Sequence, residues 1–144
     1  MTKSLVIGYG NDLRSDDGAG RVVAARVSAL DLPGVEIRAV SQLTPELALE
    51  ITRFDLVIFV DASVDVTETT TTPVRAAPTQ PAAMTHYASP ESLLGMTATI
   101  GPVPALAYAV SIPVSDLGLG FELTPSTELG VEAAVSAITA ILVE

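Results

Sequence analysis

Short apolar runs alternate with segments of helical periodicity along this chain, and no other feature restricts the possible folds as strongly. Residues 4–7, 35–40 and 55–60 read as strands, and the third, DLVIFV, is apolar over nearly its whole length. Between the first two strands, apolar side chains recur at helical spacing, at Ala19, Val22, Val23, Val27 and Leu30. Strands that alternate with helices indicate an α/β fold with a mostly parallel sheet.

We therefore predict one α/β domain over residues 1–144, with three layers: a mostly parallel, twisted sheet flanked by helices. Right-handed crossovers between consecutive parallel strands predict the order 2-1-3 for the first three strands. Residues 105–114 predict a later strand, and residues 74–76, within a stretch rich in threonine and proline, predict a short edge strand. Further helices are expected where a Ser or Thr precedes a proline, at Thr44, Ser89 and Thr124.

The composition excludes several classes of function. A net charge of −10 makes nucleic acid and anionic membranes poor partners. Because the sequence has no cysteine, disulfides, thiolate catalysis and cysteine-bound metals are excluded. The uncharged stretch 92–115 contains three prolines and two glycines, which favour a buried strand over a membrane span. With an amino-terminal apolar run too short for a signal peptide, we expect a cytoplasmic protein.

A glycine-rich loop, GYGNDLRSDDGAG at residues 8–20, follows the first strand. Such loops usually approach phosphate, but Leu13 stands where a dinucleotide-binding motif needs its third glycine, and the next positions are acidic. The Gly-Lys-Ser/Thr of a nucleotide-binding P-loop is also missing. The loop is therefore better suited to a cation than to a nucleotide.

Two acids are expected to meet at the edge of the sheet where ligands bind. With the order 2-1-3, the loop carrying Asp17 and the residue after the third strand, Asp61, lie beyond the carboxyl ends of neighbouring strands. The single histidine, His86, precedes a predicted helix and offers a third ligand. Two carboxylates and one imidazole suit a divalent transition metal such as Ni, Zn or Mn.

Each of these residues also has a plainer interpretation. Asp16 and Asp17 suit the first turn of a helix capped by Ser15, where acids stabilise the positive end of the helix dipole. Asp61 is suited to capping a turn, and His86 to a solvated loop. We expect Glu91 to lie on a solvated helix face. Tyr9 is expected to pack in the core, with the lining of a groove as the alternative.

Four segments together resemble one family, the hydrogenase maturation endopeptidases. VIGYGNDLRSDDGAG is similar to the family's opening signature, and DLVIFVDAS to its third strand with the terminal aspartate. THYASPESLL stands where the family has its histidine, and AVSIPVSDLGLGFELTP resembles its late strand, loop and final helix. The resemblance runs in order along essentially the whole chain.

This resemblance implies a function. The family's enzymes are endopeptidases, grouped with the aspartic type, that remove a C-terminal extension from the large-subunit precursor of [NiFe] hydrogenase after nickel insertion. The nickel carried by the precursor is recognised by two acids and a histidine, which correspond here to Asp17, Asp61 and His86. Catalytic roles are then expected for Asp17 and Asp61, with Asp16 as a neighbouring residue or general base. A monomer is expected to suffice.

Two competing functions stay open at this stage. A non-catalytic module that senses nickel occupancy of the precursor would need the same ligands. An unrelated α/β hydrolase or nucleotide-binding domain would bind nucleotide and would not depend on His86.

Overall fold

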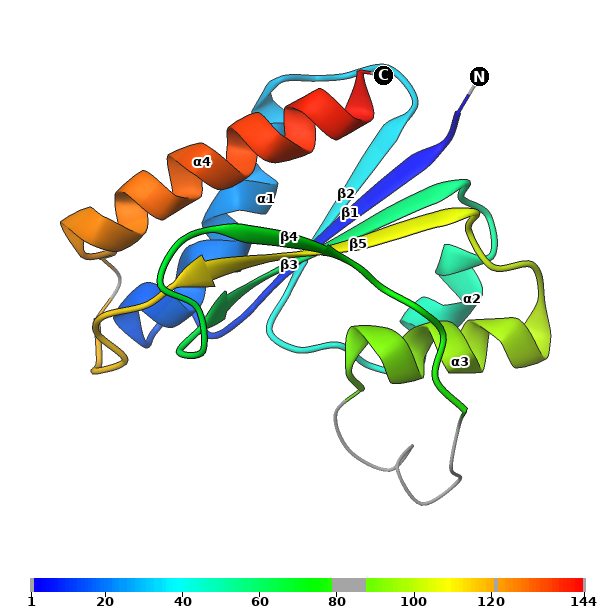
Figure 1. The fold of residues 1–144 in the computed structure, drawn as a ribbon, viewed down its shortest axis with the longest axis horizontal. Coiled ribbons are helices and arrows are strands. Elements are labelled where there is room, and N and C mark those ends of the chain that lie inside the picture. Colours follow the sequence, from blue (N-terminus) through cyan, green and yellow to red (C-terminus); the bar gives the residue numbers. More distant parts are fainter. Residues whose placement is uncertain (1, 79–87, 121, 144) are drawn as a thin grey trace.

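The computed structural model describes residues 2–78, 88–120 and 122–143, and it places one five-stranded sheet between two layers of helices (Figure 1). The strands are β1 (Ser4–Tyr9), β2 (Val35–Val40), β3 (Leu56–Ser63), β4 (Thr70–Pro73) and β5 (Leu106–Pro113). A 3-10 turn, η1 (Ser15–Gly18), precedes the helices α1 (Ala19–Ala29), α2 (Leu47–Ile51), α3 (Pro90–Ile100) and α4 (Pro125–Leu142). The three-layer α/β architecture predicted from the sequence is confirmed.

The strand order is β2-β1-β3-β5-β4. The pairings of β1 with β2 and with β3, and of β3 with β5, are parallel, whereas β4 runs antiparallel to β5 at the edge. The predicted order of the first three strands is therefore confirmed. Gly8 pairs with Val60, so β1 and β3 reach the carboxyl edge of the sheet side by side.

Both faces of the sheet are buried. Alternate residues of β1 and β3, such as Leu5 and Phe59, point into a core that they share with α2 and α3. The residues between them, such as Val6 and Ile58, pack against α1 and α4 on the other face. Because residues 4–8 of β1 and 56–60 of β3 are buried by these two layers, both segments are almost entirely apolar in sequence.

The helix α3 shows how local sequence sets an element boundary. The Ser89 hydroxyl accepts a hydrogen bond from the Ser92 backbone N–H at 3.1 Å, and the Ser92 hydroxyl accepts one from the Ser89 N–H at 2.8 Å. This reciprocal capping satisfies two backbone donors. Pro90 follows at the first helical position, where its missing N–H costs no hydrogen bond.

Three boundaries differ from those predicted. β3 continues past the apolar run to Ser63 because its pairing with β5 extends to Ser63 and Pro113, so Asp61 lies within the strand. The edge strand β4 is formed by Thr70–Pro73 instead of residues 74–76, because these β-branched threonines pair with β5. Ser15 does not cap a helix with its side chain; its backbone N–H binds the Gly120 carbonyl instead.

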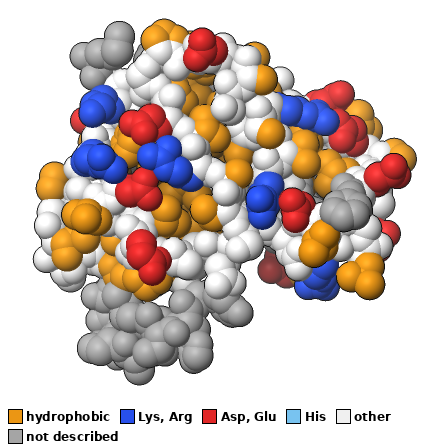
Figure 2. Space-filling view, turned by 180° about the vertical axis from the view of Figure 1, so that it is seen from behind, with side chains coloured by type: hydrophobic (Ala, Val, Ile, Leu, Met, Phe, Trp, Pro, Cys, Tyr) orange, Lys and Arg blue, Asp and Glu red, His pale blue; other side chains and the backbone are white. Residues whose placement is uncertain are grey.

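The face turned away from the viewer in Figure 1 carries positive and negative side chains close to one another (Figure 2). Among the ion pairs of the described residues, Arg38 contacts Glu50 at 2.9 Å and Glu36 at 3.1 Å. Of the helices in the described segments, none has both the length and the hydrophobicity of a membrane span.

Candidate active site

The candidate site lies at the carboxyl edge of the sheet, where β1 and β3 end next to each other. The chain leaves β1 at Tyr9, forms the acidic loop (residues 10–18) and enters α1. Asp61 lies in β3, one residue beyond the pairing of Gly8 with Val60. This is the edge at which ligands bind in parallel α/β sheets.

Two glycines bring the acidic loop close to the strand ends. At Gly20, in the first turn of α1, a Cβ atom would lie only 2.4 Å from the Val60 carbonyl oxygen and 2.6 Å from that of Tyr9. At Gly10, which has a φ of +147°, a Cβ atom would lie 2.0 Å from the backbone oxygen of Asp17. Only glycine permits both contacts, so these residues set the position of Asp17 beside the sheet.

Asp17 and Asp61 are near enough for their charges to interact. The pKa of Asp61 is raised to about 6, mainly by burial and additionally by the negative charges of Asp17 and Glu91, whereas a hydrogen bond from Tyr9 opposes the increase. The Asn11 backbone N–H donates to Asp17 Oδ2 at 2.9 Å and orients that carboxylate. The fold thus brings together the two acids that the sequence places at this edge. A pair of carboxylates that repel one another provides a suitable environment for a cation.

Tyr9 belongs to this group of side chains. Burial, the negative charge of Asp61 and a hydrogen bond to Asp61 together raise the pKa of Tyr9 well above the ordinary value of 10.0. The hydroxyl is therefore protonated at neutral pH and donates to the Asp61 carboxylate. Its aromatic ring packs against the core beneath the site, as expected from the sequence.

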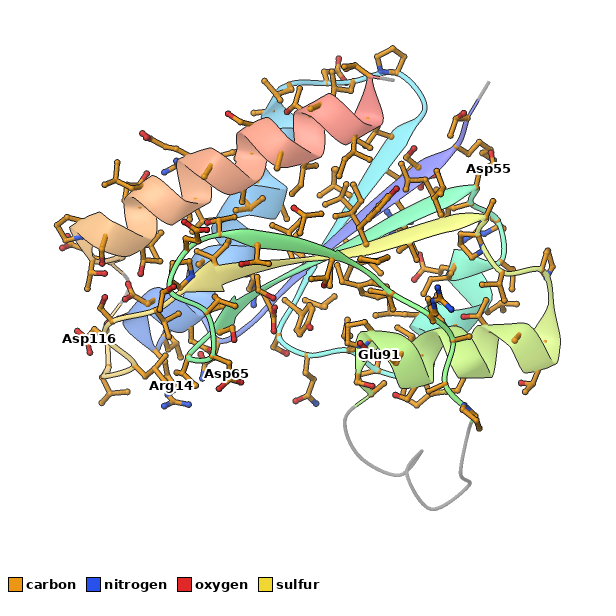
Figure 3. All side chains as sticks on the ribbon, viewed as in Figure 1. Arg14, Asp55, Asp65, Glu91 and Asp116 are labelled. Carbon is orange, nitrogen blue, oxygen red and sulfur yellow. The ribbon has the colours of Figure 1, made fainter. Side chains whose placement is uncertain are left out.

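Glu91 is the functional candidate that the sequence reasoning missed. It is exposed in the first turn of α3, as expected for a solvated helix face, but its charge also raises the pKa values of Asp61 and Tyr9. In Figure 3 it lies at the end of α3 that begins beneath the sheet. In the sequence, Glu91 follows a capping serine and a proline, which indicates that it lies at the start of a helix. The local sequence does not indicate which strand this end of the helix faces.

Asp16 is fully buried and is occupied by hydrogen bonds. Its Oδ2 atom accepts from the backbone N–H groups of Ser115 at 2.7 Å and Asp116 at 2.9 Å, and from the Thr124 hydroxyl at 2.9 Å. Its Oδ1 atom accepts from the Thr124 N–H at 2.7 Å. Burial acts to raise the pKa of Asp16, but these hydrogen bonds outweigh it and lower the pKa to about 2. The Asp16 carboxylate therefore connects the acidic loop to the loop after β5.

His86, the third ligand expected from the sequence, lies outside the described residues. Within residues 2–78, 88–120 and 122–143, no three His, Cys, Asp or Glu side chains converge in the way that a metal site requires. The described part of the site thus offers two carboxylates, Asp17 and Asp61, with Tyr9 hydrogen-bonded to Asp61 and the charge of Glu91 acting on it. Oxygen donors of this kind are compatible with a divalent metal ion.

Comparison with solved structures shows which proteins share this architecture. No family model matches the chain, and no curated protein matches its sequence. The hydrogenase maturating endopeptidase HybD from E. coli superposes with a TM-score of 0.75 and 24% identity, over 97% of this chain and 91% of that one. This chain has the fold of the hydrogenase maturation endopeptidases.

Two further structures agree with this assignment of the fold. An endopeptidase from Escherichia coli has a TM-score of 0.73 and 26% identity, over 97% of this chain and 91% of its own. The [NiFe] hydrogenase maturation protease HycI from Thermococcus kodakarensis has a TM-score of 0.71 and 22% identity, over 99% of this chain and 94% of its own. The family resemblance seen in the sequence motifs is confirmed at the level of the whole fold.

Proposed function

We propose that this protein is a processing endopeptidase that removes the C-terminal extension of a [NiFe] hydrogenase large-subunit precursor after nickel has been inserted. The observation that carries the proposal is the approach of Asp17 and Asp61 at the carboxyl edge of β1 and β3. It is supported by the shared fold with proteins that are named as hydrogenase maturation proteases. We further propose that a monomer carries out the reaction in the cytoplasm.

In this proposal the nickel ion belongs to the substrate. It reaches the protein already bound to the precursor and completes its coordination with Asp17, Asp61 and His86. Carboxylate oxygen and imidazole nitrogen are suitable ligands for nickel, and only the inserted metal would allow them to bind the precursor. Recognition of the metal thereby restricts cleavage to precursors that carry nickel.

Docking through the nickel brings the scissile peptide bond to the carboxyl edge of the sheet. Water then adds to the carbonyl carbon, the C–N bond breaks, and a proton is transferred to the leaving amine. A carboxylate near the metal is suited to accept the proton of the attacking water. Asp61 is better placed for this than Asp16, because both oxygen atoms of Asp16 are occupied by hydrogen bonds inside the fold. We therefore give Asp16 a positioning role instead of the general-base role weighed from the sequence.

The test is to incubate the protein with nickel-loaded and nickel-free precursor and to weigh the products by mass spectrometry. We expect a C-terminal peptide to be released only from the loaded form, and Asp61→Asn and His86→Ala to abolish the release. Binding of the loaded precursor without cleavage would instead favour a nickel-sensing module. Equal cleavage of both forms would contradict recognition of nickel.

A further inference from the structure

Two leucines on the loops around the site are exposed although the fold has large cores that bury leucine elsewhere. Leu119, in the loop after β5, is 93% exposed, and Leu13, in the acidic loop, is 50% exposed. Their loops are joined at this point, because the Gly120 N–H donates to the Leu13 carbonyl and the Ser15 N–H to the Gly120 carbonyl, both at 2.9 Å. We call Leu13 and Leu119 the leucine ridge.

The loops that carry the leucine ridge are held in place by polar contacts. The Asp16 carboxylate accepts hydrogen bonds from both ends of the β5 loop, at Ser115 and Thr124. Arg14 Nε donates to the Leu117 carbonyl at 3.1 Å. These contacts hold the ridge exposed to solvent in the free protein. An apolar surface that is already ordered binds a partner with a smaller loss of conformational entropy.

Leu13 is linked to the candidate active site through Asn11. Asn11 Oδ1 accepts a hydrogen bond from the Leu13 N–H, and the Asn11 N–H donates to Asp17 Oδ2, both at 2.9 Å. Labelled residues of these loops, Arg14 and Asp116, lie at the same end of the sheet in Figure 3. A precursor that places its nickel ion between Asp17 and Asp61 must therefore approach the ridge as well.

A second contact is needed for a physical reason. Coordination of one metal ion fixes a point on the substrate, but it does not orient the peptide bond that follows. Productive cleavage requires that bond to be aligned, and alignment needs contacts away from the metal. Two exposed leucines beside the metal-facing acids are suited to supply such a contact.

We propose that the leucine ridge docks apolar side chains of the folded precursor next to its metal centre, and so orients the scissile peptide. The proposal rests on the proposed function. Along the chain the ridge has three acidic neighbours, Asp12, Asp116 and Glu122, and one basic neighbour, Arg14, in a chain with a net charge of −10. Like charge disfavours a second copy of this chain or an anionic membrane as the occupant of the ridge.

The test compares the wild type, a Leu13→Ser/Leu119→Ser double variant and a Leu49→Ser control in the cleavage of nickel-loaded precursor. Leu49 is 66% exposed on α2 and is therefore a matched control. We expect the double variant to lower kcat/KM about tenfold or more, with KM raised by the weaker docking and kcat lowered by the poorer alignment of the peptide bond. The control should match the wild type. Melting temperatures should agree within about 2 °C because the replaced side chains are exposed.

The outcomes separate this proposal from the proposed function. If the wild type cleaves the precursor and the double variant has the same kcat/KM, the docking role alone is overturned. If the wild type cleaves no precursor, both proposals fail. Two other outcomes would assign the ridge to another occupant and overturn the proposal. One is a wild-type dimer in sedimentation that is lost in the double variant, and the other is wild-type binding to phosphatidylglycerol vesicles that is lost in the double variant.

Discussion

Replacement of Asp16 by asparagine tests whether a buried ionised carboxylate joins the two loops of the site. The side chain is fully buried and accepts four hydrogen bonds, three from backbone N–H groups and one from the Thr124 hydroxyl. Asparagine has nearly the same shape, but it has no charge and replaces one acceptor oxygen by a donor NH2 group. At least one buried donor then faces another donor.

The pKa of Asp16 sets the size of the expected effect. A pKa of about 2 in the folded protein, against the ordinary 3.8, means that the carboxylate stabilises the fold by about 2 kcal/mol at neutral pH. Because the folded pKa is the lower one, this stabilisation is present above pH 3.8 and is lost as the pH falls toward 2. The mismatched donor adds to the loss, so Asp16→Asn should cost about 2 to 3 kcal/mol at pH 7.

Urea unfolding followed by circular dichroism at pH 7 and pH 3 measures this directly. At pH 3 the charge contributes only about half as much, so the difference between wild type and Asp16→Asn should narrow by about 1 kcal/mol. Asp12→Asn is the control, because Asp12 lies in the same loop with its side chain 55% exposed and only a 4.0 Å contact to Arg21. Two results would contradict this role of the Asp16 charge. The first is a difference in unfolding free energy between wild type and Asp16→Asn that is the same at both pH values, and the second is a loss of stability in Asp16→Asn no larger than that in Asp12→Asn.

Three further outcomes follow from the site. In the proposed function nickel is bound by the ionised Asp61 carboxylate, whose pKa is about 6, so kcat/KM for precursor cleavage should fall about tenfold per pH unit below pH 6 in a pH profile. Glu91→Gln should move that inflection to lower pH, since a charge that raises the pKa of Asp61 is removed; an unchanged profile would argue against their interaction. Gly20→Ala should cost about 2 kcal/mol or more in urea unfolding, because its Cβ atom would lie 2.4 Å from the Val60 carbonyl oxygen, and wild-type stability would contradict this close approach.

The sequence by itself determined the architecture, and it predicted the edge of the sheet at which the candidate site lies. The apolar runs at residues 4–7 and 55–60 predicted buried parallel strands, because hydrophobic periodicity is a local property that each segment carries. Asp17 and Asp61 were predicted to meet at one edge of the sheet, since the handedness of crossovers leaves few orders for the first strands. These inferences needed no knowledge of contacts between distant residues.

Only the tertiary structure decided what surrounds the two acids. The bonds from Asp16 to Ser115 and Thr124 join residues that are 99 and 108 positions apart, and no local pattern records such a pairing. The influence of Glu91 on Asp61 likewise depends on where α3 begins relative to β3. Burial and charge act through space, so the lowered pKa of Asp16 and the raised pKa of Asp61 are set only once the chain has folded.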